Sequence, residues 1–477
     1  MNPETSWVEP EMFDDRIDAS FYGPEHLHND LVLKSAPFGA ERLRMYLKRV
    51  FKGAFYILSS EYRDAGIPFL RVTEITQGYV DTSQCTHLDP MVHNREKKTA
   101  VEPGYLLFAK GGSIGNCAVV PASLPEANIS QDLIGAVTKV NLDPYYACAF
   151  LNSRLGVSQM KRWAQGNVHP HITNDAVKNI FIPLADGSIQ HAVGNKLRKA
   201  ERLREKAFRK QDEVNARIEE LFGRAEWNSH RPYGWMTPGF FEASRLDAWF
   251  YQPSYREMAR LLKGRSDLIP VSRIAQLACE IVDFTKCPGS QFEYFEIADL
   301  EIESGSISSK LVDVTEAPSR AKYRVAPGDV LVSTVRPNRK GVALVPNSAR
   351  FAVCSSGFSA LRCSTKALAH YLRACFAQDI ATDQLMRWNT GATYPAIDRE
   401  VPLGILVPWP GEAIACELGA VLEEIANDFT EVQRLVDEAI TDIEALVAGT
   451  IEIPLLIRAD QEIGEWLNQN PLEKRSA

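Results

Sequence analysis

The chain of 477 residues contains one sequence pattern twice, and this duplication constrains its fold more than any other feature. Residues 16–24 read RIDASFYGP and residues 245–253 read RLDAWFYQP, so six of nine positions are identical at an offset of 229. Further blocks recur at a constant offset of 225, and two of them are expected to be strands. These blocks pair 69–75 with 294–300 (the expected strands), 101–104 with 325–328, 159–166 with 384–391, and 180–183 with 405–408. The chain therefore holds two similar units.

Each copy ends in a stretch with the apolar spacing of a long helix. In both stretches, apolar residues recur mainly at steps of three and four, which is typical of a seam between paired helices. In the first stretch they are Ile189, Val193, Leu197, Ala200, Ala207, Val214, Ile218 and Leu221, and the positions 225 later are also apolar. Gly223 and Gly449 are expected to end the two helices.

The two predicted helices carry opposite charge. Residues 196–210 contain eight Lys or Arg and two acidic residues, whereas residues 412–444 contain one Arg and ten acidic residues. This complementarity favours pairing of the helices with each other, although each could instead pack on its own domain. The acidic helix also accounts for the net charge of −8, which would otherwise count against nucleic-acid binding.

We therefore expect an α+β protein with pseudo-twofold symmetry, in which two similar globular domains alternate with two long helices. The helices pair as an antiparallel coiled coil in this prediction. The expected limits are residues 1–186 and 225–411 for the domains, 187–224 and 412–450 for the helices, and 451–477 for a C-terminal tail outside the repeat.

The composition and motifs exclude several classes of protein. No apolar run is long enough to span a membrane, and the first ten residues lack the features of a secretory signal, so we expect a cytoplasmic location. Nine cysteines without a Cys-x-x-Cys pair predict neither disulfides nor a zinc site.

No phosphate-binding loop, zinc-protease motif or nucleophile elbow is present. Residues 143–146 (DPYY) are the nearest approach to an amino-methyltransferase loop, but they lack its second proline and better fit a helix N-cap. We expect a non-catalytic protein with no cofactor and no metal site.

One loop in each copy carries side chains suited to contact duplex DNA. Such contacts need groups that hydrogen-bond to base edges, together with cations that approach phosphates. In the first copy this loop is glycine-rich, and it could equally be a plain hairpin turn; in the second copy it is a denser basic cluster. The candidates are Lys110, Ser113 and Asn116 in the first copy, and Arg336, Asn338, Arg339 and Lys340 in the second.

A second loop follows a repeated Arg-Trp pair. Trp163 and Trp388 are expected in the core rather than stacked on bases. The polar residues after them differ between the copies, as expected of two domains that recognise different DNA sequences. These candidates are Gln165, Asn167 and His169 in the first copy, and Asn389, Thr390, Thr393 and Tyr394 in the second. Arg71 is a further candidate, because Glu296 stands at the matching position.

These features resemble the specificity (S) subunit of type I restriction-modification systems, over about residues 12–450. The resemblance is carried by residues 103–115 (PGYLLFAKGGSIG), by the IFIP ending at 180–183 before a helix, and by the duplication itself. The second copy departs from the pattern, because residues 336–341 (RPNRKG) replace the glycine-serine loop and GFS at 357–359 replaces DLI at 132–134.

The resemblance implies that the two globular units are target-recognition domains that read a bipartite, asymmetric DNA target. It also implies the partners: double-stranded DNA, two DNA methyltransferase (M) subunits and, in a restricting complex, translocase-nuclease (R) subunits. Members of this family carry no catalytic site. The competing interpretation is a duplicated non-catalytic scaffold or adaptor of a phage-defence complex, which recruits proteins through its helices.

Overall fold

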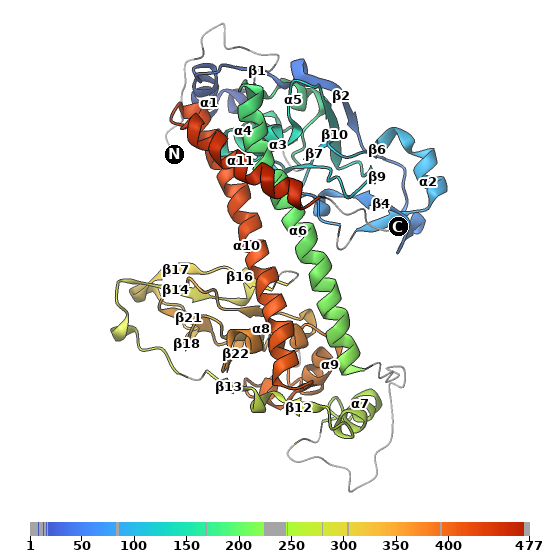
Figure 1. The fold of residues 1–477 in the computed structure, drawn as a ribbon, viewed down its shortest axis with the longest axis vertical. Coiled ribbons are helices and arrows are strands. Elements are labelled where there is room, and N and C mark those ends of the chain that lie inside the picture. The colour runs from blue at the N-terminus through green and yellow to red at the C-terminus, as the bar shows by residue number, and fades with distance from the viewer. Residues whose placement is uncertain are drawn as a thin grey trace. The chain divides into compact units, whose positions relative to one another are not determined.

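The computed structural model divides the chain into two compact units that mix helices and strands (Figure 1). Unit 1 comprises residues 1–205 and 429–477, and unit 2 comprises residues 206–428. The division passes through both long helices, so each unit holds one globular part and half of each helix. The structure describes residues 8, 13, 16, 18–82, 85–166, 169–223, 245, 247–278, 280–302, 305–391 and 394–471.

Unit 1 contains a four-stranded sheet, a five-stranded sheet and a two-stranded pair. The first sheet has the order β2 (Leu47–Lys52), β10 (Leu133–Thr138), β7 (Leu106–Ala109), β8 (Cys117–Val119). The second has the order β3 (Tyr62–Arg63), β5 (Thr86–Leu88), β4 (Ile67–Leu70), β9 (Ala127–Ile129), β6 (Ala100–Val101), and the pair is β1 (Ala40–Arg42) with β11 (Phe181–Pro183). The helices before the long one are α1 (Pro24–Lys34), α2 (Pro90–Arg95), α3 (Pro144–Asn152), α4 (Arg154–Trp163) and α5 (Asn174–Asn179).

Unit 2 repeats this plan with a second set of strands. Its counterpart of the first sheet has the order β13 (Ala275–Leu277), β22 (Phe358–Cys363), β19 (Val330–Ser333), β20 (Val342–Leu344). Another sheet has the order β17 (Lys310–Asp313), β14 (Gln291–Phe295), β21 (Ala352–Ser355), β18 (Ala321–Val325), with the pairs β12 (Leu268–Pro270) and β23 (Leu406–Pro408), and β15 (Leu300–Glu301) and β16 (Ser306–Ile307). The helices are α7 (Pro253–Lys263), α8 (Lys366–Phe376) and α9 (Asp379–Arg387).

The first repeated block owes its recurrence to a local capping motif. The Asp18 carboxylate accepts a hydrogen bond from the Phe21 N–H at 3.2 Å, and the Asp247 carboxylate accepts one from the Phe250 N–H at 3.0 Å. Both phenylalanines are buried. The same side chains are therefore needed twice because the globular part of each unit contains the same turn.

The two strands predicted over residues 69–75 and 294–300 are shorter than expected. β4 ends at Leu70 and β14 ends at Phe295, and each is followed by a 3-10 turn, η5 (Val72–Glu74) or η9 (Ile297–Asp299). In unit 1 the Glu74 carboxylate accepts a hydrogen bond from the Arg71 N–H at 2.6 Å. That bond turns the backbone away from the ladder, so the strand prediction was wrong beyond Leu70.

The long helices are α6 (Gly187–Phe222) and α10 (Glu412–Ala448). They end one residue before Gly223 and Gly449, whose φ angles are 75° and 71°, so both predicted stops are confirmed.

The helices pair in antiparallel fashion within each unit (Figure 1). In unit 1 the first half of α6 lies against the second half of α10, where Leu197 and Ala439 share a buried core and Lys196 Nζ lies 2.6 Å from the Asp442 carboxylate. In unit 2 the second half of α6 meets the first half of α10, where Lys210 Nζ lies 2.6 Å from the Glu424 carboxylate. The opposite charges seen in the sequence therefore face each other.

The segment beyond the repeat forms a further helix, α11 (Ile453–Gln469). Its Leu456 and Ile463 are buried in unit 1. The Asp460 carboxylate accepts a hydrogen bond from the Asn195 side chain of α6 at 2.8 Å. The tail is therefore part of the fold of unit 1.

No helix among the described residues combines the length and apolar character needed to cross a bilayer.

The two interhelical lysines should differ in their contribution to stability. The Lys196 side chain is 9 % exposed, and burial raises the pKa of its partner Asp442, so Lys196→Ala leaves a poorly solvated carboxylate without its cation. We expect this change to lower the free energy of unfolding by about 3 kcal/mol. Lys210→Ala is the matched control, because its partner Glu424 is 53 % exposed and the expected loss is below about 1 kcal/mol. Denaturant unfolding measures both, and equal losses would contradict the assignment.

Candidate nucleic-acid interface

The two candidate loops of unit 1 meet on one surface although they lie far apart in the sequence. The Lys110 carbonyl accepts a hydrogen bond from the Ile172 N–H at 2.9 Å, and Gly111 pairs with His171. Gln165 and His171 exchange both of their backbone hydrogen bonds at 2.9 Å. The structure thus brings the 110–116 loop and the 165–171 loop together.

Some side chains of these loops are exposed, and others form hydrogen bonds. Ser113, Gln165 and His169 are exposed. Lys110 Nζ donates to the Gln131 carbonyl at 3.2 Å, and the Asn116 amide donates to the Ile75 carbonyl at 3.2 Å. The Asn116 side chain therefore joins its loop to the end of η5. The candidate Asn167 lies outside the described residues.

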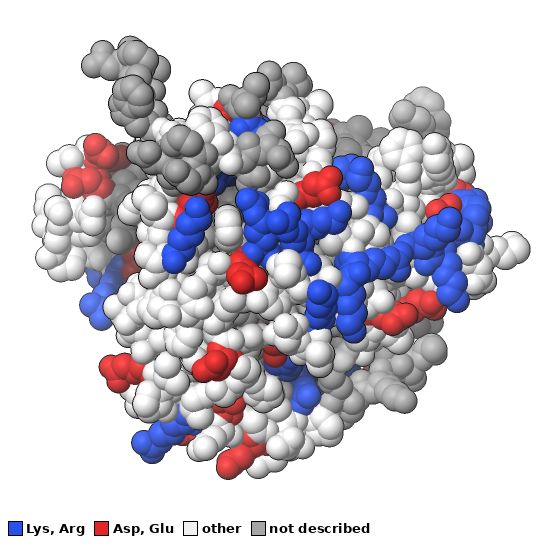
Figure 2. Space-filling view, turned by 90° about the horizontal axis from the view of Figure 1, so that it is seen from above, with Lys and Arg blue, Asp and Glu red and all other residues white. Residues whose placement is uncertain are grey.

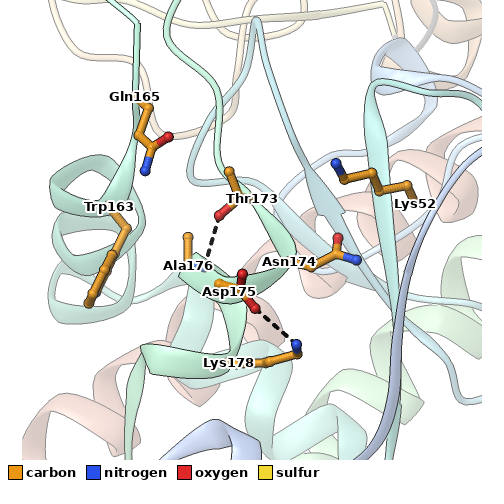
Figure 3. A pocket seen from close by; sticks show the side chains of 8 residues that line it. All are labelled: Lys52, Trp163, Gln165, Thr173, Asn174, Asp175, Ala176 and Lys178. Carbon is orange, nitrogen blue, oxygen red and sulfur yellow. Dashed lines mark hydrogen bonds and ion pairs between the residues drawn. The ribbon is translucent and has the colours of Figure 1, made fainter. Parts of the chain in front are cut away.

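A pocket of about 560 Å³ adjoins this surface (Figure 3). Lys52, at the end of β2, and Gln165 both line it, together with the start of α5. Figure 3 shows that their side chains enter from different segments of the chain. On its floor, Lys178 Nζ lies 2.9 Å from the Asp175 carboxylate. The pocket connects the candidate loops to strand β2.

Strand β2 and the turn before it carry a basic surface that the candidate residues did not include. Residues 42–52 contain five Lys or Arg and no acidic residue, and Arg44, Lys48, Arg49 and Lys52 are exposed. Arg49 donates to the Lys98 carbonyl at 2.7 Å, which adds a second basic segment. Figure 2 shows a face on which Lys and Arg side chains gather in a band. A basic run free of acidic residues was the sequence signal for this surface.

Arg71 and Glu296 occupy equivalent places, each just before a 3-10 turn. The Arg71 guanidinium lies 3.0 Å from the buried Glu74 carboxylate, which raises the pKa of Arg71. Glu296 instead pairs with Lys310. Arg71 is 37 % exposed in its side chain, so part of the group still faces solvent.

The two loops of unit 2 meet in the same way. The Arg336 N–H donates to the Pro395 carbonyl at 2.7 Å, and Val335 pairs with Ala396. Arg339 is exposed, as is Asn338. The last candidate of this loop, Lys340, is partly neutralised, because its Nζ lies 2.8 Å from the Asp379 carboxylate.

The second loop of unit 2 holds itself together through its polar side chains. The Asn389 side-chain oxygen accepts from the N–H groups of Gly391 and Ala396, each at 2.9 Å, and the Thr390 hydroxyl donates to the Ala396 carbonyl at 3.2 Å. Asn389 is therefore engaged in the loop rather than free to read a base. Tyr394 is 56 % exposed. Thr393 lies outside the described residues.

The repeated tryptophans have unequal environments. Trp163 is 8 % exposed and packs edge-on against Phe21, with ring centroids 4.7 Å apart. Trp388 makes the same contact with Phe250 at 4.9 Å but is 38 % exposed. The core assignment is confirmed for Trp163 and holds only in part for Trp388.

Asp143, the first residue of the segment compared with a methyltransferase loop, has a structural role. Asp143 caps α3 by accepting from the Tyr145 N–H at 2.9 Å, which confirms the N-cap interpretation, and it also pairs with Arg198 at 2.8 Å. Among the described residues, no group of three or more His, Cys, Asp or Glu side chains is arranged to hold a metal ion.

No protein-family model and no curated protein matches the chain. Among solved structures, it is similar to the S subunit of the type I restriction-modification system of M. genitalium, with 11% identity, a TM-score of 0.44, and coverage of 88% of this chain and 97% of that one. It is also similar to the HsdS subunit from Thermoanaerobacter tengcongensis, with 16% identity, a TM-score of 0.27, and coverage of 92% and 98%.

We expect the basic surface of β2 to contact phosphates. The double variant Arg44→Ala, Lys48→Ala should weaken binding to all duplexes alike and reduce the slope of log affinity against log salt by about two. Fluorescence anisotropy over a salt series measures this slope. The control Arg217→Ala, Arg260→Ala removes the same charge from exposed side chains paired with Glu220 and Glu257. An unchanged slope in the first variant would place β2 away from DNA.

Proposed function

We propose that the chain is the sequence-specific DNA-binding subunit of a type I restriction-modification complex. In this role it reads a bipartite, asymmetric target and docks methyltransferase subunits. One observation carries the proposal: in each unit the same two loops meet through equivalent backbone contacts, while the side chains at their tips differ.

The difference in side chains supports an asymmetric target. Unit 1 presents Gln165 and His169 beside Lys110, whereas unit 2 presents Arg336 and Arg339. Amide side chains suit the paired donor and acceptor of adenine, and arginine suits the two acceptors of guanine. Two units that share the same loop backbone contacts but carry different side chains on those loops are therefore suited to two different half-sites.

The long helices suit the spacing of such a target. An α-helix of 36 residues, the length of α6, extends for about 54 Å. We propose that α6 and α10 act as a spacer that leaves several base pairs unread between the half-sites. Their remaining exposed faces would accept two methyltransferase subunits and, in a restricting complex, translocase-nuclease subunits.

The competing function is a duplicated scaffold that recruits proteins without reading DNA. The ten acidic residues of the 412–444 stretch favour it, because an acidic helix suits a basic protein partner. Sequence-selective, salt-dependent binding of duplex DNA by the purified chain separates the two functions, because only the first requires it.

Methylome sequencing of the host with and without this gene should reveal a lost motif with two different half-sites and a degenerate gap.

Deleting residues 207–213 and 422–428 together removes two facing heptads, including the Lys210–Glu424 pair. The gap should then shorten by about three base pairs, since seven helical residues span about 10.5 Å, while each half-site stays unchanged. A palindromic or continuous motif would overturn the proposal that the two units recognise two different half-sites.

The purified chain should neither methylate nor cleave DNA when S-adenosylmethionine, ATP and Mg²⁺ are supplied, because the proposed role assigns catalysis to its partners. Methyl transfer should appear only when a methyltransferase subunit is added. Incorporation of labelled methyl groups is the measurement, and turnover by the chain alone would contradict the proposal.

A further inference from the structure

Unit 2 contains a pocket of about 620 Å³ whose lining combines cations with one carboxylate. Arg336 and Arg339 enter it from the first candidate loop, and Tyr394 enters from the second. Arg320 and Glu296 line it as well. The pocket therefore lies where the two loops of this unit meet.

The three arginines of this pocket have no carboxylate partner among the residues that the structure describes. Elsewhere in unit 2, Arg324 pairs with Glu280 at 3.4 Å and Arg362 pairs with Asp329 at 2.7 Å. A guanidinium group presents five N–H donors, and donors gathered in a pocket favour a ligand that offers acceptors.

Arg336 is restrained by contacts within unit 2. Its backbone adopts the left-handed region with a φ of 53°, and its N–H is bound to the Pro395 carbonyl. Its guanidinium lies 4.3 Å from the centre of the Tyr394 ring, which restrains the planar group. A non-glycine residue in this conformation is strained, and such strain is concentrated at functional sites.

Because Glu296 adds a negative charge to its lining, this pocket differs from a site that binds phosphate alone. One oxygen, Oε1, pairs with Lys310, and no other hydrogen bond or ion pair of this carboxylate is formed among the described residues. A phosphate offers only acceptors and would be repelled by this carboxylate. In the major groove, a G·C pair offers two acceptors on guanine and an amino donor on cytosine. Arginine donors beside a glutamate acceptor match that pattern.

We propose that this pocket reads a G·C base pair in the half-site bound by unit 2. Arg336 donates to O6 and N7 of guanine, Glu296 accepts from the N4 amino group of cytosine, and Arg339 contacts the adjoining phosphate. This inference rests on the proposed function. Unit 1 cannot use the same contacts, because Arg71 stands in place of Glu296 and is paired with Glu74.

Selection of bound duplexes from a random library by the full chain tests the inference. The unaltered chain should enrich a guanine at one fixed position of one half-site. Arg336→Ala should reduce the preference for that guanine by about tenfold or more, and leave the other half-site and the salt dependence unchanged. Arg350→Ala is the matched control, because it removes an exposed arginine of unit 2 that does not line the pocket.

Replacing the selected guanine with 7-deazaguanine removes the N7 acceptor and provides a test that needs no variant. The unaltered chain should bind this duplex less tightly, whereas Arg336→Ala should not distinguish the two duplexes. If Arg336→Ala fails to fold, the binding of 7-deazaguanine by the unaltered chain still tests the inference.

The possible failures are distinguishable. No sequence preference at all would contradict the proposed function. Two half-sites without a required G·C pair, or equal binding of 7-deazaguanine and guanine by the unaltered chain, would overturn only this inference. A uniform loss of affinity with a smaller salt slope in Arg336→Ala would assign Arg336 to a phosphate and overturn it too.

Discussion

The antiparallel pairing of α6 with α10 is the contact on which the rest of the structure depends. An apolar seam supplies the burial, and buried Lys196 with its partner Asp442 adds a specific polar contact. Neither unit is complete without it, because each takes one half of each helix. A buried ion pair contributes little net stability but makes other registers costly, since a shifted helix would leave a charge unpaired.

The duplication made the architecture predictable, because a constant offset reports two copies whatever their function. The helix ends were predictable from Gly223 and Gly449, since a left-handed residue is needed there. The strand limit at Leu70 was not, because it depends on a side-chain bond from Glu74 that no periodicity reveals. Helix α11 was missed because it lies outside the repeat.

The candidate site was predictable in its position but not in the role of each side chain. Comparing the copies located the loops, yet the Asn116 side chain proved to be engaged with the Ile75 carbonyl, and that of Asn389 with the backbone of its own loop. The basic run at residues 42–52 escaped notice because the comparison favoured features present in both copies, whereas this run is found in one. The sequence alone does not show which polar side chains of a loop form hydrogen bonds within the protein and which remain available to a ligand.

The division of the chain also bears on the order in which it folds during synthesis. Unit 2 is one continuous stretch, residues 206–428, whereas unit 1 needs residues 1–205 and also 429–477. During translation, all residues of unit 2 are therefore synthesised before residues 429–477, which unit 1 needs to complete its fold. Until then Val193 and Leu197 expose an apolar stripe, which favours aggregation or binding by a chaperone. A premature stop directly after residue 428 would therefore leave unit 2 complete and destabilise unit 1, which contains the first residues of the chain.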